Sequence, residues 1–273
     1  MKKTRKFAKT AKSLAMAAAV IMSACVFSAC SGGAKNTVNS IDDLSGKHIG
    51  VQLDTVGDIF ASDIEGAVVE RYTKGADAIQ ALKQGAIDAV IIDNDPANVF
   101  ISYNSDIKIL DEAFADEEYA IAVQKGNTEL LNDINGALAE LTAEGVMDNI
   151  KANWIGDSAT GKPYVFPDGT FPDGGMESTE KLVMATNAEF PPYELMVGED
   201  VGGFDVDMMR AVCAKLNMEL EIKNMEFDTI ITAVESGTVD VGVAGMTITE
   251  ERKEKVDFSD PYTTSKQVVV VRK

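Results

Sequence analysis

Residues that build metal sites and disulfides are scarce in this sequence. Its 273 residues include one histidine, His48, and three cysteines. One histidine without a Cys/His cluster argues against a structural zinc site. We therefore expect no metal and no cofactor. Cys25 and Cys30 fall in the amino-terminal leader described below, so Cys213 is left without a disulfide partner. Because it lies in an apolar helical pattern, we expect Cys213 to be a buried small hydrophobic residue.

Basic residues are also in short supply. The chain has 25 lysines and arginines against 44 aspartates and glutamates, which gives a formal net charge of −19. Removal of residues 1–29 would take away six basic residues and no acidic one, and would lower that charge to −25. Such a surface repels nucleic acid, and no basic patch interrupts it. We therefore expect no nucleic-acid partner.

The amino terminus has the pattern of a secretory signal. Six basic residues precede a mostly apolar or small stretch at 14–27. This stretch is rich in alanine and shorter than the roughly 20 apolar residues of a membrane span. A transmembrane helix is therefore the second choice.

A lipid anchor is predicted directly after this signal. Residues 27–30, Phe-Ser-Ala-Cys, resemble a lipobox, in which cleavage exposes a cysteine that is then lipid-modified. Cys30 is preferred because a small, flexible Ser-Gly-Gly tether follows it, while Met-Ser-Ala-Cys at 22–25 is the weaker candidate. Two or more acyl chains on one cysteine would anchor the protein durably. An ordinary cleaved signal with a coincidental cysteine is the alternative.

From residue 40 onward, short apolar runs alternate with helical patterns. Strands are predicted at 48–53, 67–72, 87–93, 107–110, 119–124, 181–186, 219–224, 239–244 and 267–271, and helices at 56–65, 75–84, 95–103, 128–143, 146–154, 203–216 and 227–236. Such alternation predicts α/β units around largely parallel sheets. Residues 156–180 interrupt the pattern: they are rich in turn residues, lack periodicity and read as a linker.

The most informative stretch follows the apolar run Val239–Ala244, which predicts a buried strand. Thr247 and Glu250 fit a capping box, and Thr249 is a second possible N-cap. A helix that starts after a strand presents unpaired N–H groups, which suit an anion. Arg252 in its first turn can hold a carboxylate with two parallel hydrogen bonds. The alternative is that Arg252 is one more solvated charge.

A resemblance to a known family favours the first interpretation. Residues 245–252, Gly-Met-Thr-Ile-Thr-Glu-Glu-Arg, followed by Val-Asp-Phe-Ser-Asp-Pro-Tyr at 256–262, resemble the signature of the polar amino-acid-binding proteins of bacterial ABC importers. The resemblance implies an α/β fold of the periplasmic-binding-protein type II: two lobes around a ligand cleft, each a mixed, mainly parallel sheet flanked by helices. It also implies that Arg252 clamps the ligand's α-carboxylate, with Gly245 and Thr247 contributing polar contacts beside it.

The same resemblance implies further ligand-binding residues. Phe190 matches an aromatic ring that stacks on the ligand, Phe227 a second cleft aromatic, and Asn187 a polar group near the ligand side chain. Asp93 matches the carboxylate that pairs with the α-ammonium group, and Asp95 takes that role if the register is off by two. A charge-assisted bond in a closed, drier cleft is stronger than the same pair in water. The alternatives are that the rings cover the core and that Asp93 caps a helix.

One departure from the family concerns residues 54–56. The family usually has Gly-Thr-Thr or a close variant where this chain has Asp54, Thr55 and Val56. Thr55 and Val56 match positions that bind the carboxylate from the second lobe. Val56 keeps its N–H but lacks the hydroxyl, and Asp54 adds a negative charge. The departure predicts either weaker carboxylate binding or a preference for a cationic ligand side chain.

The order of the parts also differs from that of the family. Family members begin with a segment like residues 185–194, and reach a segment like residues 40–47 only after a strand like residues 267–272. Here the second part comes first, and residues 156–180 join the usual C-terminus to the usual N-terminus. The resemblance therefore implies a circular permutant, and it covers nearly all of residues 38–273 once the two parts are exchanged.

This interpretation assigns each part of the chain to a segment. The predicted segments are a signal peptide at 1–29, a lipidated tether at 30–39, lobe two at 40–115, an interlobe hinge strand at 116–125, the C-terminal helices of lobe one at 126–155, the permutation linker at 156–180 and the rest of lobe one at 181–273. We expect one covalent crossing between the lobes, near 116–125. The chain ends near Val38 and Val271 are expected to pair beside it.

The function expected from the resemblance is that of an extracytoplasmic lipoprotein, anchored in the lipid bilayer through Cys30. It would capture a polar or basic L-amino acid as a monomer and deliver it to an ABC permease. A dehydratase-like enzyme acting on small carboxylates is the alternative, with Glu189 or Glu226 as general acid or base. No nucleophile–base pair, phosphate loop or metal motif accompanies these glutamates. A third class is the sensor lobe of a signalling protein.

Overall fold

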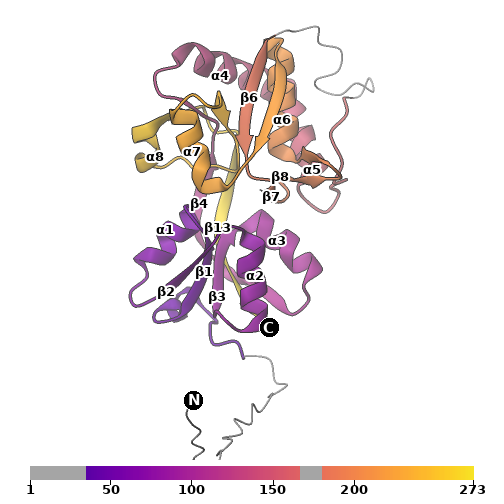
Figure 1. Cartoon of the computed structure of the whole chain (residues 1–273). Coiled ribbons are helices and arrows are strands. Elements are labelled where there is room, and N and C mark those ends of the chain that lie inside the picture. Colours follow the sequence, from indigo (N-terminus) through magenta and orange to yellow (C-terminus); the bar gives the residue numbers. More distant parts are fainter. Residues whose placement is uncertain (1–34, 167–179) are drawn as a thin grey trace, which may run out of the picture. The chain divides into compact units, whose positions relative to one another are not determined.

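The computed structural model describes residues 35–166 and 180–273, which belong to one compact unit, residues 33–273. The predicted signal peptide, Cys30 and residues 167–179 of the predicted linker lie outside the described residues. Within the described ranges, every helix is too short or too polar to span a bilayer. Two five-stranded sheets divide the unit into two lobes, each flanked by helices (Figure 1). The α/β class predicted from the sequence is confirmed.

Lobe two contains a mixed sheet in the order β2-β1-β3-β13-β4. Its strands are β1 His48–Gln52, β2 Val68–Tyr72, β3 Ala89–Asp93, β4 Ile107–Tyr119 and β13 Thr263–Arg272, and its helices are η1 Ile41–Leu44, α1 Val56–Asp63, α2 Gly75–Gln84 and α3 Asn94–Tyr103. The first three strands are parallel, and β13 runs antiparallel to both β3 and β4. All five residues of β3 are buried, as expected of a central strand that is covered on both faces.

Lobe one contains a sheet in the order β10-β6-β11-β5-β12, and a small sheet of β7, β8 and β9. The strands are β5 Ala122–Gln124, β6 Lys181–Thr186, β7 Glu189–Phe190, β8 Glu194–Val197, β9 Asp200–Gly202, β10 Glu219–Asn224, β11 Val241–Gly242 and β12 Val256–Phe258, and the helices are α4 Thr128–Ala143, α5 Val146–Trp154, α6 Phe204–Leu216, α7 Phe227–Glu235 and α8 Glu250–Lys255. Segments from before and after residues 167–179 therefore build one lobe.

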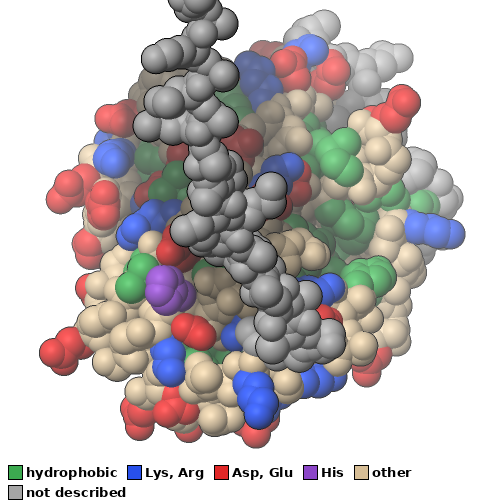
Figure 2. Space-filling view, turned by 60° about the horizontal axis from the view of Figure 1, so that its bottom comes forward, with side chains coloured by type: hydrophobic (Ala, Val, Ile, Leu, Met, Phe, Trp, Pro, Cys, Tyr) green, Lys and Arg blue, Asp and Glu red, His purple; other side chains and the backbone are tan. Residues whose placement is uncertain are grey.

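Buried apolar side chains fill both faces of each sheet. In lobe one, α4, α5 and α6 contribute to one cluster and α7 to another, and lobe two likewise has two clusters. Trp154 of α5 is buried, and its Nε1 donates a hydrogen bond of 2.6 Å to Asp207 of α6. Cys213 is buried, as expected. His48 lies half-exposed at the surface of lobe two, where acidic and basic side chains are interspersed (Figure 2).

Among the described residues, two stretches of chain connect the lobes, so the expectation of a single covalent crossing is wrong. Residues 119–122 lead from β4 into β5, and residues 258–263 lead from β12 into β13. β13 pairs with β4 along its whole length, from Thr263 opposite Tyr119 to Arg272 opposite Ile107. The β-branched run near residue 270 is therefore the end of a long strand that starts at the hinge.

This strand also corrects the predicted boundary of lobe one and the placement of the chain ends. The end of β13 belongs to the sheet of lobe two, although residues 181–273 were assigned to lobe one. Its first half alternates buried and exposed positions, beginning with buried Thr263 and Ser265. Because these buried residues are polar, the sequence has no apolar run there that would predict a strand. Val38 packs in the core of lobe two with Val271, but it belongs to no described strand. The two chain ends therefore do not pair as strands beside the hinge.

Candidate functional site

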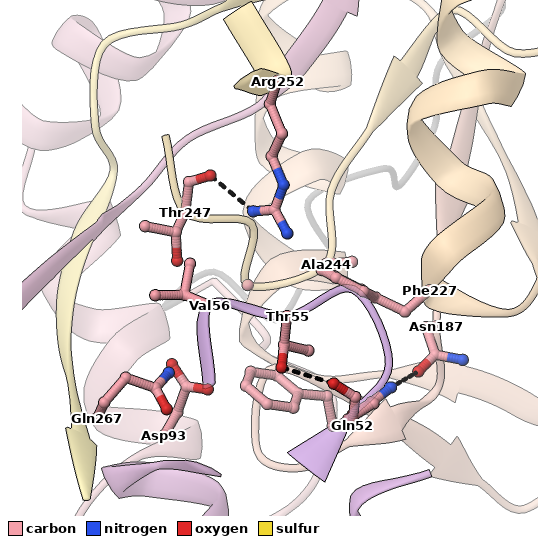
Figure 3. A pocket seen from close by; sticks show the side chains of 12 residues that line it. Gln52, Thr55, Val56, Asp93, Asn187, Phe227, Ala244, Thr247, Arg252 and Gln267 are labelled. Atoms are coloured by element: carbon pink, nitrogen blue, oxygen red, sulfur yellow. Dashed lines mark hydrogen bonds between the residues drawn. The ribbon is translucent and has the colours of Figure 1, made fainter. Parts of the chain in front are cut away.

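A pocket lies between the two lobes and is lined by residues of both (Figure 3). The space between its walls is about 310 Å³, with the open mouth included. The nine residues predicted to bind a ligand all line it: Arg252, Thr247, Gly245, Asp93, Phe190, Asn187, Phe227, Thr55 and Val56. The structure thus brings together side chains that are up to about 200 positions apart in the sequence.

Three further residues line the pocket and were not predicted: Gln52, Ala244 and Gln267. Gln52 is the last residue of β1 and Ala244 ends the strand predicted at 239–244, so the rule that ligands bind at the carboxyl ends of strands could have found them. Gln267 lies inside β13, where no loop or motif marks it. Glu189 and Glu226, the acids that the enzyme alternative requires, do not line this pocket.

Arg252 is held in place by the start of α8. Thr249 is the N-cap, and its Oγ1 accepts a hydrogen bond of 3.2 Å from the Arg252 N–H. The guanidinium donates to the carbonyl oxygens of Thr247 at 2.7 Å and of Asp54 at 2.8 Å, and its Cζ lies 5.4 Å from the centre of the Phe227 ring. The side chain is therefore fixed by two backbone carbonyls and one aromatic face.

The charge of Arg252 is not paired in a salt bridge with any described carboxylate. Arg252 is 7 % exposed, and among the described residues no carboxylate forms a salt bridge with it. Burial lowers the pKa of Arg252, and the largest opposing effect is that of the Asp54 carboxylate. Because an arginine stays protonated in proteins, the pocket contains a buried positive charge with free donor capacity. Such a group suits a small anion that brings its own charge.

A negative charge lies across the pocket, at the end of β3. Asp93 is buried, and the Tyr119 hydroxyl donates a short hydrogen bond to its Oδ1. Glu117 is buried beside it, and its Oε2 accepts hydrogen bonds from Gln267 at 3.1 Å and Thr247 at 3.3 Å. Burial, and then the neighbouring Asp93, raise the pKa of Glu117 to about 8. Burial likewise raises the pKa of Asp93, so the two neighbouring carboxyl groups titrate as a pair.

The structure also decides between the alternatives for Asp93. Asp93 is the N-cap residue of α3, but its side chain makes no capping hydrogen bond. It points into the pocket instead (Figure 3). Asp95 does not line the pocket; its Oδ2 accepts a hydrogen bond of 2.6 Å from the Tyr193 hydroxyl of lobe one. Asp93 is therefore the acid of the pocket, and Asp95 joins the lobes.

The third part of the pocket is formed by two amides and two rings. The Gln52 Nε2 of lobe two donates to the Asn187 Oδ1 of lobe one at 3.1 Å, and the Asn187 Nδ2 donates to the Met225 carbonyl at 2.9 Å (Figure 3). Phe190 stacks on Tyr193, with ring centres 5.7 Å apart. Phe190 and Phe227 thus provide apolar walls, and the Gln52–Asn187 pair provides amide groups.

Two predicted contacts differ in detail from what was expected. The Gly245 N–H is already used, because it donates to the buried Asp205 Oδ2 at 2.8 Å. The Thr55 hydroxyl donates to the Gln52 carbonyl at 2.8 Å and caps α1. Asp54, which was expected to matter through its charge, has a φ of 64° and uses its carbonyl to accept the bond from Arg252. The first N–H groups of α1 still lack intrahelical acceptors.

Comparisons with known proteins give one family and several partial relatives. The model of the family described as bacterial extracellular solute-binding proteins, family 3, matches residues 34–157 and 182–273. The arginine-binding extracellular protein ArtP of Bacillus subtilis (strain 168) is 40 % identical over 105 residues, which are 38 % of this chain and 41 % of that protein. A probable histidine-binding protein of Neisseria gonorrhoeae is 43 % identical over 91 residues, 33 % of this chain and 34 % of that protein.

A longer sequence match and a match to a solved structure were also found. The L-cystine-binding protein TcyJ of Escherichia coli (strain K12) is 32 % identical over 130 residues, 47 % of this chain and 49 % of that protein. The chain thus spans less than half the length of each of these curated relatives. Among solved structures, an ancestral arginine-binding protein bound to arginine shares 50 % identity, with a TM-score of 0.30 and coverage of 30 % of this chain and 37 % of that one.

Proposed function

The chain belongs to the bacterial extracellular solute-binding proteins, family 3, and from that premise we propose that its pocket binds one free L-amino acid with a polar or basic side chain. The observation that carries the proposal is the buried Arg252 guanidinium, which forms no salt bridge with the described carboxylates. A zwitterion satisfies both ends of the pocket, since its carboxylate neutralises Arg252 and its ammonium group neutralises Asp93.

The remaining groups support the kind of side chain. With the α-carboxylate at Arg252 and the α-ammonium at Asp93, the ligand side chain extends between the Phe190 and Phe227 rings toward Gln52 and Asn187. These amides offer carbonyl oxygens, which accept hydrogen bonds from amide, ammonium, imidazole or guanidinium groups. The names of the relatives, which specify arginine, histidine and cystine, agree with a polar or basic side chain.

The same proposal includes delivery to an ABC permease in the membrane by an anchored monomer. Capture would take place by closure of the two lobes around the two chain crossings, a hinge motion of the usual kind. Cys30 would carry the lipid after removal of residues 1–29. The order of the segments would be that of a circular permutant, with residues 156–180 as the join. The packing of α5 on α6 by way of Trp154 supports this last point, because it places both sides of the join in one lobe.

The test is thermal unfolding of the compact unit, residues 33–273, against a panel of the common amino acids. A ligand at about 100 times its Kd stabilises by roughly 2.7 kcal/mol, which corresponds to a rise in Tm of about 5–10 °C. We expect one amino acid, or one chemically related group, to give such a rise. Arg252→Ala should abolish it, since the carboxylate then has no partner.

The control is Arg71→Ala, which removes an arginine that lies on β2 of lobe two instead of an arginine in the pocket. Arg71 pairs with Asp58 at 2.8 Å, is about half exposed and lies outside the pocket. This variant should lower the Tm and keep the ligand-induced rise. If no amino acid raises the Tm of a cooperatively unfolding wild type, the amino-acid proposal is wrong.

A further inference from the structure

Among the described residues, five side-chain hydrogen bonds join the two lobes around the pocket. They connect Arg252 with the Asp54 carbonyl at 2.8 Å, Gln52 with Asn187 at 3.1 Å, Tyr193 with Asp95 at 2.6 Å, Lys74 with Glu189 at 2.6 Å, and Thr247 with Glu117 at 3.3 Å. Three of them come from one loop of lobe one, residues 187–193. This loop also supplies Asn187 and Phe190 to the pocket wall. The structure is therefore of the closed form, and this loop contributes most of the contacts that close it.

The bond between Lys74 and Glu189 combines two features. It joins two full charges, Lys74 Nζ of lobe two and Glu189 Oε1 of lobe one. Neither residue lines the pocket. The remaining four bonds each include a pocket residue or a neutral partner. An effect of Lys74 on ligand binding would therefore not come from contact with the ligand.

The position of the pair links it to the pocket wall. Glu189 stands between Asn187 and Phe190, which both line the pocket, on strand β7. Lys74 is the N-cap residue of α2, and a Cβ on the next residue, Gly75, would lie 3.8 Å from the Gln52 Oε1. The pair thus lies beside the Gln52–Asn187 bond. With side-chain exposures of 40 % and 34 %, both charges are partly shielded from water.

We propose that Lys74 and Glu189 set the affinity of the pocket without touching the ligand, because their ion pair forms only when the lobes are closed. A contact present in one of two states shifts the equilibrium toward that state by its own free energy, whichever ligand is bound. A ligand enclosed between the lobes leaves only after they open. Loss of the pair should therefore raise the dissociation rate constant and leave the association rate constant nearly unchanged. This inference rests on the proposed amino-acid-binding function.

The experiment is a charge-reversal cycle in the unit of residues 33–273, with L-arginine and L-glutamine as probes in stopped-flow measurements. Lys74→Glu and Glu189→Lys should each raise the dissociation rate roughly two- to five-fold for every probe that binds. The double variant should bring it back close to that of the wild type, since it restores one bond of opposite polarity. The affinity of the wild type should also fall more with salt, up to about 0.5 M, than that of Lys74→Met.

The control makes the same charge change within one lobe. Lys215 of α6 pairs with Glu144, at the C-cap of α4, also at 2.6 Å, and both lie in lobe one. Lys215→Glu should leave both rate constants at wild-type values. The proposal is overturned if Lys74→Glu behaves like Lys215→Glu, if it acts mainly on association, or if the double variant is as weak as the two single changes combined.

A ligand-free measurement separates this inference from the proposed function. Spin labels on Glu65 of lobe two and Thr232 of lobe one, both exposed and changed to cysteine, report the distance between the lobes; Cys213 is buried and stays unlabelled. Lys74→Glu should reduce the share of the shortest distances, and the double variant should restore it. If no amino acid binds but this shift occurs, only the amino-acid proposal fails. If amino acids bind and the distances do not respond, the ion-pair proposal fails.

Discussion

At the scale of single residues, Gly245 lines the pocket and has a backbone conformation that residues with a Cβ rarely adopt. Its φ is +52°, and a Cβ placed there would lie 2.6 Å from the Phe190 Cε1. Gly245→Ala should therefore lower the free energy of unfolding by about 1–2 kcal/mol from backbone strain, and displace a ring that lines the pocket. We expect a clear loss of amino-acid affinity in addition to the loss of stability. Urea unfolding and ligand titration measure the two effects.

Gly126→Ala is the matched control for this change. Gly126 has a φ of +81°, and a Cβ there would meet nothing within 4 Å. Both variants share the left-handed strain, and only Gly245→Ala adds the clash with Phe190. Gly126→Ala should lower stability and keep the affinity. Equal affinities in the two variants would show that the ring is not positioned by this glycine.

Glu117 gives a second prediction at this scale, in the dependence of stability on pH. Burial raises its pKa from 4.5 to about 8, so the folded state binds the proton more strongly than the unfolded state. The contribution to stability is then fully present below the unfolded pKa. It is lost as the pH rises through the folded pKa, by up to about 1.4 kcal/mol per pH unit. Glu117→Gln keeps the shape and removes this titration.

Urea unfolding between about pH 5 and 8 tests this expectation. The free energy of unfolding of the wild type should fall with pH more steeply than that of Glu117→Gln. Glu118→Gln serves as the control, because Glu118 is the exposed neighbour on the same strand and its substitution should leave the wild-type slope. Parallel slopes for Glu117→Gln and the wild type would contradict the buried, protonated carboxyl group.

At the scale of elements, the sequence predicts well those helices and strands that have a local cause. Alternating apolar runs and helical patterns predict β3, α4 and the strand before Gly245, because burial on one or both faces sets the spacing of apolar residues along the chain. Thr249 was one of two proposed N-caps for α8, and it is the residue that accepts the Arg252 N–H. The predicted pocket residues came from the resemblance to a family whose ligand-binding residues lie near the ends of strands or the starts of helices.

The failures at this scale have a non-local cause. The hinge half of β13 is polar, because its buried side chains, such as Ser265 and Gln267, face Glu117 and the pocket rather than an apolar core. Only the pairing with β4 reveals it as a strand. Gln52 was missed for a similar reason, since its role depends on an amide 135 positions away. Contacts between distant segments do not produce a periodic pattern of residue types in the sequence.

At the scale of the whole molecule, the proposed circular permutation predicts where the chain tolerates a break. The described chain ends lie in lobe two: Val38 packs in its core with Val271, and the Lys273 N–H donates to the Asp106 carbonyl at 2.9 Å. A chain that starts at Glu180, runs to Lys273, continues through a short Gly-Ser linker to Asn36 and ends at Phe166 restores the order of the family. Every described helix and strand is kept whole in it.

We expect this rearranged chain to fold and to show the same ligand-induced rise in Tm as the unit of residues 33–273, with affinity within about two-fold. Thermal unfolding against the amino-acid panel measures both. The comparison is a chain opened between Ser265 and Lys266, inside β13, which cuts one of the two crossings and the ladder to β4. That chain should unfold at a much lower temperature, because the break interrupts the strand that pairs with β4 in the sheet of lobe two. If the rearranged chain is instead the one that fails, the order of the segments is a requirement of this fold and not a permutation of it.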